Sequence, residues 1–499
     1  MISLLGEGAI INDEKWFNDM LEDLNIKYIL FGVKSVSGGY EIEEMYRMFP
    51  KNKEMMEFRR TVTKDMEKKD IRELFEEYSR KMKVVRGLEK SSQFSNISPQ
   101  RYKFHCDALG IYFEAIGQLK DGLSQKNSLS PAIQSILEEI KGYLSNNIIM
   151  QNINNVREVK EFFRNHSFII SVGKDFLKIR KTKQEDDPQS GDKFGNLFLG
   201  ETGVKSFSSD GNLLPIEKTL VQYFEQNEKV ILKKMKQLWD IQVDERFLTL
   251  EKELQFYLSF FKYIAQFEQR GYEFCLPELA DGIEIEDGYD FALAGKELSG
   301  PRRVITNCFR IEGKERMVVI TGANGGGKTT YARMAGEILF FSNLGLLVPA
   351  KSAKVPFFGR ILTHFSTEES EKTGRGKLLE ELHRLKPLFE NKEENQFVIL
   401  NELFTTAATK DALEMGECVM DMVIDRNMRG VYVTHIQGLA KETDHVVSMV
   451  AELCEDHKTR SYKISRRLPN EEEYEDSIIE KHHLLEGQIK EVLSHVLSK

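Results

Sequence analysis

Residues 321–330 of the chain are Thr-Gly-Ala-Asn-Gly-Gly-Gly-Lys-Thr-Thr. The segment Gly322–Thr329 fits the pattern G-x-x-x-x-G-K-[ST], in which glycines precede a lysine and a hydroxyl residue. It follows the apolar run Met317–Ile320 and precedes the helical pattern Thr330–Phe341. A loop of this composition between a strand and a helix is typical of phosphate-binding loops, so the stretch predicts an α/β domain that binds a nucleotide.

The residue types of this loop indicate its chemistry. Consecutive glycines allow backbone N–H groups to turn inward around anionic oxygens, and the N-terminus of the next helix adds partial positive charge. We expect Lys328 to reach the β- and γ-phosphates of ATP and the Thr329 hydroxyl to ligate Mg²⁺. The alternative is a glycine-rich turn without a ligand, which the neighbouring lysine, threonine, strand and helix disfavour. The predicted ATP-binding residues are Gly322, Ala323, Asn324, Gly325, Gly326, Gly327, Lys328, Thr329 and Thr330.

A second apolar run, Phe397–Leu400, is followed by Asn401 and Glu402. An acidic residue after such a strand commonly completes the Mg²⁺ shell, and a glutamate next to it can polarise the attacking water. Asn401 keeps an oxygen for the metal but lacks the charge. Glu402 is the candidate general base, although a lone glutamate after a strand is more often a surface residue.

A third apolar run, Val431–Thr434, precedes His435. All three runs are short and rich in Val and Ile, with helical patterns between them, which favours buried parallel strands. The carboxyl ends of parallel strands meet at one edge of a sheet, where ligands collect. His435 is therefore predicted to sense or stabilise the γ-phosphate, and the alternative is a structural histidine.

The sequence before this domain has a mostly helical pattern. Apolar residues recur at helical spacing from about Asp13 to Leu123 and again in Pro131–Leu144, where proline is allowed in the first turn. Ser167–Lys181 instead holds two β-rich runs around Val-Gly-Lys-Asp, which predicts a hairpin. A polar loop and a short strand candidate, Asn196–Leu199, complete a predicted β insertion. Its basic residues either contact a phosphate backbone or only keep an exposed hairpin solvated.

Helical spacing continues from about Ile216 to Gln269. One continuous helix would be roughly 80 Å long, whereas a break near Val243–Arg246 would divide it. Such a length indicates a coiled-coil arm or a lever, and the alternative is an ordinary member of a helical bundle. We divide the chain into a helical N-terminal region over 1–125, a helical lever or core over 126–276 with a small β insertion near 167–210, and an α/β P-loop ATPase domain over 277–499.

Composition and charge restrict the class of protein. The 499 residues are 41% hydrophobic and 30% charged, as in soluble globular proteins with exposed helices. A formal charge of −9 gives no global signature of nucleic-acid binding, so any such contact must come from a local basic surface. The five cysteines form no Cys-x-x-Cys pair, and we find no export signal or membrane span. We expect a cytoplasmic protein without membrane contact.

Four stretches, in this order, resemble the ATPase domain of the MutS family, the mismatch-repair branch of the ABC-type ATPases. They are TGANGGGKTTY, NLGLLVPAKSAKV, the strand with NELF, and VTHIQGLAKE. The resemblance implies an ATPase domain that uses ATP and Mg²⁺, preceded by helical levers. It also implies a DNA partner that is bound by its structure rather than by its base sequence.

The segment Gly374–Leu382, GRGKLLEEL, resembles the signature segment with which one subunit of such an ATPase completes the site of its partner. Gly374 and Glu381 match that segment, while Gly376 stands where a serine is expected. Asp411 resembles the aspartate that faces the partner subunit. These residues imply an active homodimer, and the alternative is a plain loop that leads into a charged helix.

The chain also departs from the family pattern. Asn401 replaces the usual aspartate, which predicts slower hydrolysis and weaker Mg²⁺ binding. We find no convincing Phe-x-Glu mismatch-reading element, so the resemblance predicts a short form without that N-terminal domain. No small nuclease domain is expected at the C-terminus, where SYKISRRLPN predicts a last strand followed by helices.

Two functions remain open from the sequence. The first is a MutS-like ATPase whose nucleotide state closes a dimer and moves the helical arms, with a role in mismatch repair or recombination. The second is a nucleotide-gated module that hardly hydrolyses ATP and binds a protein or structured RNA. A DNA nuclease is disfavoured, because we find no acidic or histidine cluster outside the ATP site.

Overall fold

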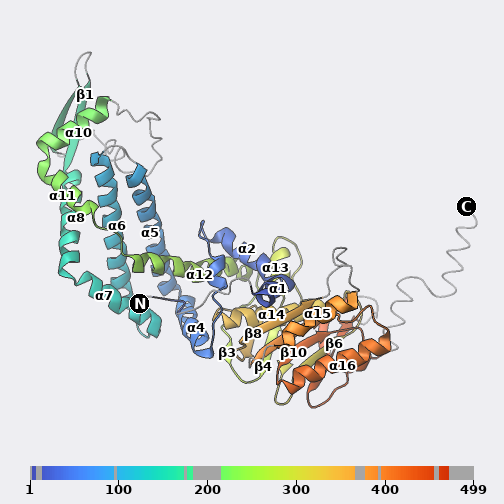
Figure 1. Cartoon of the computed structure of the whole chain (residues 1–499). Helices are drawn as coiled ribbons and strands as arrows, with labels where there is room; N and C mark the ends of the chain where they lie inside the picture. Colours follow the sequence, from blue (N-terminus) through green and yellow to red (C-terminus); the bar gives the residue numbers. More distant parts are fainter. Residues whose placement is uncertain are drawn as a thin grey trace, which may run out of the picture. The chain divides into compact units, whose positions relative to one another are not determined.

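The computed structural model of the chain forms two compact units, which we describe separately (Figure 1). The residues that it describes are 3–6, 14–94, 98–172, 177–183, 215–365, 377–390, 395–454 and 460–470. The first unit comprises Met1–Leu4 and Asp65–Leu254, and the second comprises Leu5–Lys64 and Gln255–Lys499. The prediction of a helical region followed by a C-terminal α/β region is confirmed. The boundaries at 125 and 276 stay predictions, since these units group the N-terminal helices with the sheets.

The first unit is built mainly from long helices. Helix α5 buries apolar residues at spacings of three and four, which places them on one stripe that packs against α6. Each large apolar side chain that becomes fully buried contributes roughly 1.5–3 kcal/mol. The stripe consists of Ile71, Phe75, Tyr78, Met82 and Val85. The elements are α4 (Lys53–Glu67), which ends in this unit, α5 (Lys69–Phe94), α6 (Ser98–Ser124), α7 (Pro131–Leu144), α8 (Asn147–Asn165), β1 (His166–Val172), β2 (Leu177–Lys183), α10 (Pro215–Asn227), α11 (Lys229–Trp239) and α12 (Glu245–Glu268), which begins in it.

Helix α7 agrees with the predicted range Pro131–Leu144. The Ser130 side chain accepts a hydrogen bond from the backbone N–H of Ile133 at 3.4 Å and so caps the helix, while Pro131 occupies its first turn. None of the helices in the described ranges combines the length and the hydrophobicity that a membrane span requires.

The predicted hairpin is also present. Strands β1 and β2 pair antiparallel, from His166 opposite Lys183 to Val172 opposite Leu177. Phe168 of β1 packs against Phe224 of α10, with ring centroids 5.4 Å apart. The strand candidate Asn196–Leu199 lies outside the described residues.

The helical pattern over Ile216–Gln269 forms three helices, α10, α11 and α12. Glu228 separates α10 from α11, because its backbone angles, φ of −120° and ψ of 39°, are not helical. Before α12, the Asp244 carboxylate accepts a hydrogen bond from the backbone N–H of Arg246 at 2.9 Å and caps the new helix. Of the two alternatives that the sequence left open, one continuous helix is therefore excluded, and the break near Val243–Arg246 is confirmed.

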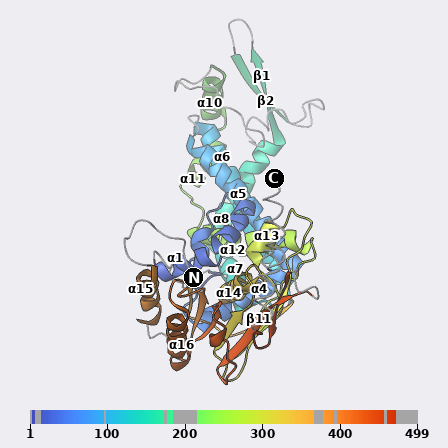
Figure 2. The same cartoon turned by 90° about the vertical axis from the view of Figure 1, so that its right-hand side faces the viewer.

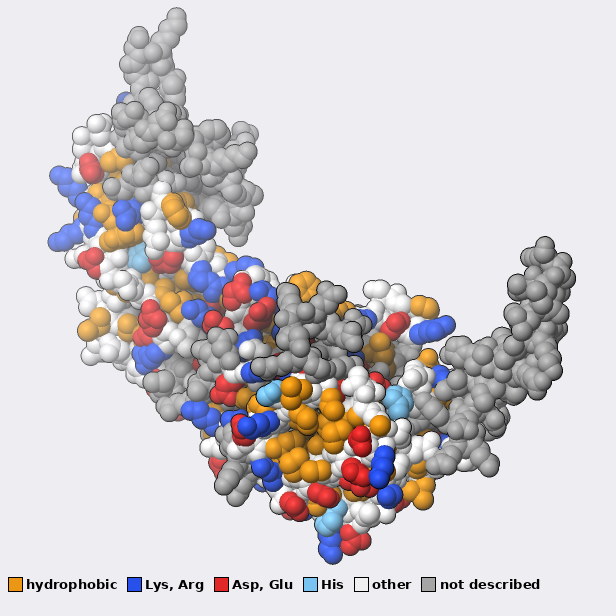
Figure 3. All heavy atoms as spheres, turned by 45° about the vertical axis from the view of Figure 1, so that its right-hand side comes forward, with side chains coloured by type: hydrophobic (Ala, Val, Ile, Leu, Met, Phe, Trp, Pro, Cys, Tyr) orange, Lys and Arg blue, Asp and Glu red, His pale blue; other side chains and the backbone are white. Residues whose placement is uncertain are grey.

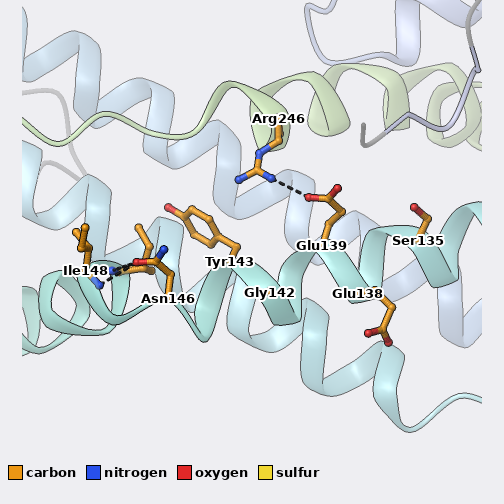
Figure 4. Close-up of a pocket in the computed structure, with 9 residues that line it drawn as sticks. Ser135, Glu138, Glu139, Gly142, Tyr143, Asn146, Ile148 and Arg246 are labelled. Carbon is orange, nitrogen blue, oxygen red and sulfur yellow. Dashed lines mark hydrogen bonds and ion pairs between the residues drawn. The ribbon is translucent and has the colours of Figure 1, made fainter.

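A groove of about 720 Å³ runs along α7 and the start of α8 (Figure 4). Arg246 of α12 reaches Glu139 of α7, with 2.7 Å between Nη1 and Oε2. Tyr143 packs edge-on against Phe247, with centroids 5.0 Å apart. Because exposed ion pairs contribute only about 0–1 kcal/mol, aromatic packing is the stronger link between α7 and α12 beside this groove.

The second unit contains the sheets. Six strands form one sheet in the order β12-β11-β6-β10-β9-β8, in which β12 pairs antiparallel to β11 and the other neighbours are parallel. The predicted buried parallel strands at 317–320, 397–400 and 431–434 correspond to β6, β9 and β10 and are confirmed. The elements are α1 (Lys15–Asp23), α2 (Ile26–Val36), α3 (Glu43–Tyr46), β3 (Glu278–Leu279), β4 (Ile283–Gly288), α13 (Phe291–Lys296), β5 (Asn307–Ile311), β6 (Met317–Thr321), α14 (Lys328–Asn343), β7 (Ser352–Val355), β8 (Arg360–Phe365), α15 (Lys377–Glu390), β9 (Gln396–Asn401), α16 (Thr409–Asp425), β10 (Arg429–Val433), η2 (Gln437–Leu439), β11 (Val446–Leu453) and β12 (Arg460–Arg466).

Helices cover both faces of the six-stranded sheet. Successive strand residues face opposite sides, so Ile399 contacts α14 while Val398 and Leu400 belong to a core cluster with α15 and α16. Figure 2 shows α15 and α16 side by side. Strands buried on both faces explain the nearly continuous apolar runs in the sequence.

A second, mixed sheet has the order β3-β7-β4-β5. The N-terminal helices belong to the same unit, because α1 packs against β8 and Arg333 of α14 donates a hydrogen bond from Nε to the carbonyl of Asp23 at 2.8 Å. The predicted helical pattern of this segment is correct. Its packing partner is set by side chains distant in the sequence.

Apolar side chains gather in a surface patch around α15, bordered by charged side chains (Figure 3). Leu379 and Leu382 of α15 are 50% and 43% exposed. Contiguous apolar surface of this kind is typical of interaction sites.

Candidate nucleotide-binding site

The predicted phosphate loop connects β6 to α14. Gly322 and Gly327 have φ angles of 117° and 91°, which L side chains rarely adopt. A Cβ atom on Gly322 would also lie 3.0 Å from the backbone nitrogen of Ala451 on β11. Gly327 precedes the first residue of α14, so the loop leads directly into a helix N-terminus. The glycines are therefore required by the conformation and close packing of this loop.

Lys328 folds back over the loop that precedes it. Its Nζ donates hydrogen bonds to the carbonyl oxygens of Gly322 at 2.8 Å and Ala323 at 3.2 Å. Burial lowers the pKa of Lys328 to about 8, with a further lowering by Arg460 and an opposing effect of Glu402. A buried amine held by neutral carbonyls gains strongly from an anion, because the anion restores the stability of its charged form.

Thr329 and Asn401 meet from different elements. Thr329 lies in the first turn of α14, and Asn401 is the last residue of β9. The Thr329 hydroxyl donates a hydrogen bond to Oδ1 of Asn401 at 3.0 Å. The structure thus brings together the two residues that the sequence suggests as Mg²⁺ ligands, and both supply neutral oxygens.

Glu402 and His435 form a second pair at the same edge of the sheet. Oε1 of Glu402 lies 3.0 Å from Nε2 of His435, and each side chain is 31% exposed. The hydrogen bond with His435, together with electrostatic attraction to His435 and Lys328, holds the pKa of Glu402 below its ordinary value against the effect of burial. Glu402 is therefore ionised at neutral pH, as a general base must be.

The backbone also positions Glu402. Its N–H donates a hydrogen bond to the carbonyl of Val433 at 2.8 Å, and its φ of 55° lies in the left-handed region. A non-glycine residue in this region is strained and persists only where surrounding contacts hold it. Glu402 is held by the strand beside β9, which explains how its side chain leaves the sheet edge towards His435.

The residues predicted to face a partner subunit lie, where the structure describes them, on α15 and α16. Glu381 of α15 is buried, and its Oε2 accepts a hydrogen bond from the backbone N–H of Phe404 at 3.0 Å. Asp411 is exposed in the first turn of α16. Gly374 and Gly376 lie outside the described residues. The contact of this set with a partner subunit stays a prediction.

Three residues near the loop were not identified from the sequence. Tyr462 of β12 is 50% exposed, and a Cβ on Gly327 would lie 3.6 Å from its ring. Asn307 of β5 fixes this strand, because its Nδ2 donates to the carbonyl of Tyr462 at 3.0 Å and its Oδ1 accepts from the N–H of Ile464 at 2.9 Å. The third residue is Arg460 at the start of β12, which contributes to the lowered pKa of Lys328. The only sequence signal for Tyr462 and the neighbouring Arg460 is the predicted last strand, and that pattern does not show that the strand returns to the loop.

Within the ranges that the structure describes, no group of three or more His, Cys, Asp and Glu side chains is arranged to hold a metal ion. The candidate residues Lys328, Asn401, Glu402 and His435 lie at the loop and the adjoining strand ends. Because β6, β9 and β10 run parallel, their carboxyl ends lie at one edge.

Comparison with known proteins agrees with this location. A sequence model of the family described as MutS domain V matches residues 318–483. The DNA mismatch repair protein MutS of Chlorobaculum parvum is 26% identical over 172 residues, which cover 34% of this chain and 20% of the relative. The proteins of the same name from Thermotoga sp. and Microcystis aeruginosa are each 28% identical, over 28% and 33% of this chain and 18% and 20% of their own lengths. The chain spans about a fifth of the length of these curated relatives. The matched range contains the described site residues from Gly322 to Tyr462.

Proposed function

Because this chain belongs to the MutS family, we propose that it binds ATP at residues 322–330 and hydrolyses it to ADP and phosphate. The observation that carries this proposal is the convergence of Lys328, Asn401 and Glu402 at the carboxyl ends of the parallel strands β6 and β9, with a hydrogen bond or electrostatic contact at each. The proposed fold is a P-loop ATPase domain of the ABC and MutS type.

ATP binding uses the loop backbone and Lys328. Inward-facing N–H groups and the N-terminus of α14 attract phosphate oxygens. The amine of Lys328 now bonds to two loop carbonyls and would exchange them for the β- and γ-phosphates. Because burial makes the charged amine costly in the absence of an anion, this exchange favours the bound state.

The residues present fit a Mg²⁺ ion that accompanies ATP. Thr329 and Asn401 offer two oxygens that already lie 3.0 Å apart, and Mg²⁺ prefers oxygen ligands. When bound, Mg²⁺ would neutralise charge on the β- and γ-phosphate oxygens. Asn401 supplies no negative charge of its own, so this chain is expected to hold the metal less tightly than an aspartate would.

Glu402 and His435 have separate roles in the proposed hydrolysis. Glu402 orients a water molecule and accepts its proton as the water oxygen attacks the γ-phosphorus and the bond to the ADP oxygen breaks. His435 orients Glu402 through their 3.0 Å contact and stabilises charge on the γ-phosphate. Proton acceptance requires an ionised Glu402, in accord with its lowered pKa.

The rate of phosphate release tests this assignment. Native protein should release phosphate from ATP, and Glu402→Gln should lose about 10²- to 10⁴-fold in rate while it retains ATP binding. Glu417→Gln, on the exposed surface of α16, is a matched control that should behave as the native chain. Equal and negligible rates for the native chain and Glu402→Gln would contradict enzymatic function.

A homodimer is the proposed active form. The signature-like segment 374–382 and Asp411 support it through the family resemblance, and the exposed Leu379 and Leu382 give the second half of that segment an apolar surface. ATP would close the dimer only through contacts that are stronger in the closed state. Small-angle scattering and light scattering with and without ATP test this step, and identical shape and mass in both conditions would exclude it.

DNA is the proposed partner of the helical arms, bound by structure and without base-sequence preference. The hairpin offers exposed Lys178 and Arg180 on β2, whereas Lys181 is paired with Glu228 at 2.8 Å. Phosphate contacts make affinity fall with salt. Binding to duplex, branched and single-stranded DNA and to RNA should be compared over a salt series, and absence of all binding would favour a protein partner.

One observation favours a second candidate, a nucleotide-gated binding module that hydrolyses ATP slowly or not at all. Asn401 stands where a charged residue would hold the metal, while Lys328, the residue proposed to bind the phosphates, is retained. Tight ATP binding without turnover, combined with binding of a protein or structured RNA, would support this candidate over the ATPase.

A further inference from the structure

Arg460 begins β12 beside the phosphate loop and has no role in the chemistry described above. We propose that Arg460 is a second cationic phosphate-binding residue, whose guanidinium donates hydrogen bonds to the terminal phosphates that Lys328 also contacts. The proposal rests on ATP binding at this site and assigns to it a residue outside the loop motif.

The β11–β12 hairpin contacts the loop at two separate points. A Cβ on Gly326 would lie 3.0 Å from the Cβ of Ala451 on β11, and a Cβ on Gly327 would lie 3.6 Å from the ring of Tyr462 on β12. Arg460 stands two residues before Tyr462 and is paired with Leu453 in the same ladder. The backbone that carries the guanidinium is therefore fixed next to the loop.

The guanidinium has an unused donor. Nη1 of Arg460 is buried, and among the residues that the structure describes it has no hydrogen-bond partner. Folded proteins rarely leave a buried charged donor without an acceptor, because it has lost water and gained nothing in exchange. A phosphate oxygen bound over the loop would supply the acceptor.

The charges around the loop support the same ligand. Lys328 bonds to the loop carbonyls of Gly322 and Ala323, and Arg460 is carried by the strand pair that contacts the same loop, so two cationic residues flank it. Two cations close together in a half-buried site repel each other, and a polyphosphate removes that repulsion by binding both.

Arginine suits this position better than lysine would. Its guanidinium stays protonated at all relevant pH values and presents several donors in one plane, which match pairs of phosphate oxygens. Lys328 acts as a single point charge, whereas the planar guanidinium of Arg460 donates hydrogen bonds in fixed directions. The pair would therefore fix the orientation of the terminal phosphates.

Displacement of a fluorescent ATP analogue from the full chain tests the proposal. ATP and tripolyphosphate serve as competitors, because tripolyphosphate carries the phosphates without the nucleoside. Arg460→Ala should weaken both competitors by a similar factor of about ten or more, and Arg460→Lys should weaken them less. Arg466→Ala is the matched control on the same strand, since Arg466 pairs instead with Glu315 at 2.9 Å and Glu442 at 2.7 Å.

The outcomes separate this inference from the proposed function. Unchanged affinities in Arg460→Ala would overturn the role of Arg460 while ATP binding stands. Loss of ATP affinity with unchanged tripolyphosphate affinity would also overturn it, because the effect would then act on the nucleoside through Tyr462. If the native chain bound neither ATP nor tripolyphosphate, ATP binding itself would be rejected. The thermal unfolding midpoint of each ligand-free variant checks folding, and Arg460→Lys replaces Arg460→Ala if the latter does not fold.

Discussion

The hydroxyl of Thr329 donates a hydrogen bond to Oδ1 of Asn401 at 3.0 Å, joining the start of α14 to the end of β9. The two residues are distant in the sequence, and both are uncharged. Their contact brings together the two oxygens that we propose as Mg²⁺ ligands, and neither belongs to a carboxylate.

Asn401→Asp should therefore tighten Mg²⁺ binding. A carboxylate adds negative charge at the oxygen that faces Thr329, and charged interactions of this type contribute about 1.5–3 kcal/mol, or roughly tenfold or more in affinity. The Mg²⁺ concentration at half-maximal ATP hydrolysis should fall accordingly. Asn395→Asp, just before β9 and away from the loop, is the control. Equal Mg²⁺ dependence of Asn401→Asp and the native chain would contradict the assignment of Asn401.

ATP binding should take up a proton near pH 8. Burial lowers the pKa of Lys328 in the ligand-free protein to about 8, and bound phosphate raises it again. As the pH rises through about 8, more of the free protein has a neutral amine, and ATP affinity falls. Calorimetry in two buffers of different ionisation enthalpy measures the uptake.

Lys328→Arg is the control for this proton uptake, because a guanidinium stays protonated over the same range. Its binding enthalpy should not depend on the buffer through this group. A native protein with no buffer dependence near pH 8 would show that Lys328 does not change protonation when ATP binds.

His435→Asn should move the acidic limb of the hydrolysis profile to higher pH. In the native chain the hydrogen bond from His435 lowers the pKa of Glu402, so the carboxylate stays ionised to lower pH. Without the imidazole, Glu402 takes up a proton at higher pH and the general base is lost earlier on acidification. The measurement is kcat for ATP as a function of pH. The pH at which kcat falls to half of its plateau gives the position of the acidic limb, whatever the plateau value of each variant.

The matched control for His435 is His445→Asn, because His445 is exposed and bonds to the carbonyl of Lys314 at 2.7 Å. Its acidic limb should coincide with that of the native chain. Coincident limbs in His435→Asn as well would show that the contact of 3.0 Å does not set the ionisation of Glu402.

Leu382→Glu should weaken ATP-promoted dimerisation. Leu382 is 43% exposed in the apolar patch around α15, and a charge placed in a buried apolar contact costs free energy on association. We expect the dimer dissociation constant to rise by about tenfold or more, measured by sedimentation. Val230→Glu, at a residue 69% exposed in the helical unit, controls for added charge. A dimer unaffected by Leu382→Glu would place the interface elsewhere.

Local sequence signals predicted much of the secondary structure correctly. Pro131 marks the start of α7, and the two β-rich runs mark the hairpin, because a proline in the first turn and strand alternation act over a few residues. For a related reason the sequence left open whether residues 216–269 form one continuous helix. Apolar spacing persists across Glu228, whose backbone leaves the helical region without a proline or glycine to signal it.

The sequence by itself determined the conformation of the glycine-rich loop, because the geometry of Gly322 to Thr329 follows from local glycine conformations and the helix that begins at Lys328. It also indicated that Asn401, Glu402 and His435 follow buried strands. Only the tertiary structure decided which of them touch, since strand order sets the neighbours of each strand end. The return of β12 to the loop, which places Tyr462 and Arg460 there, depends on long-range packing that leaves no local pattern.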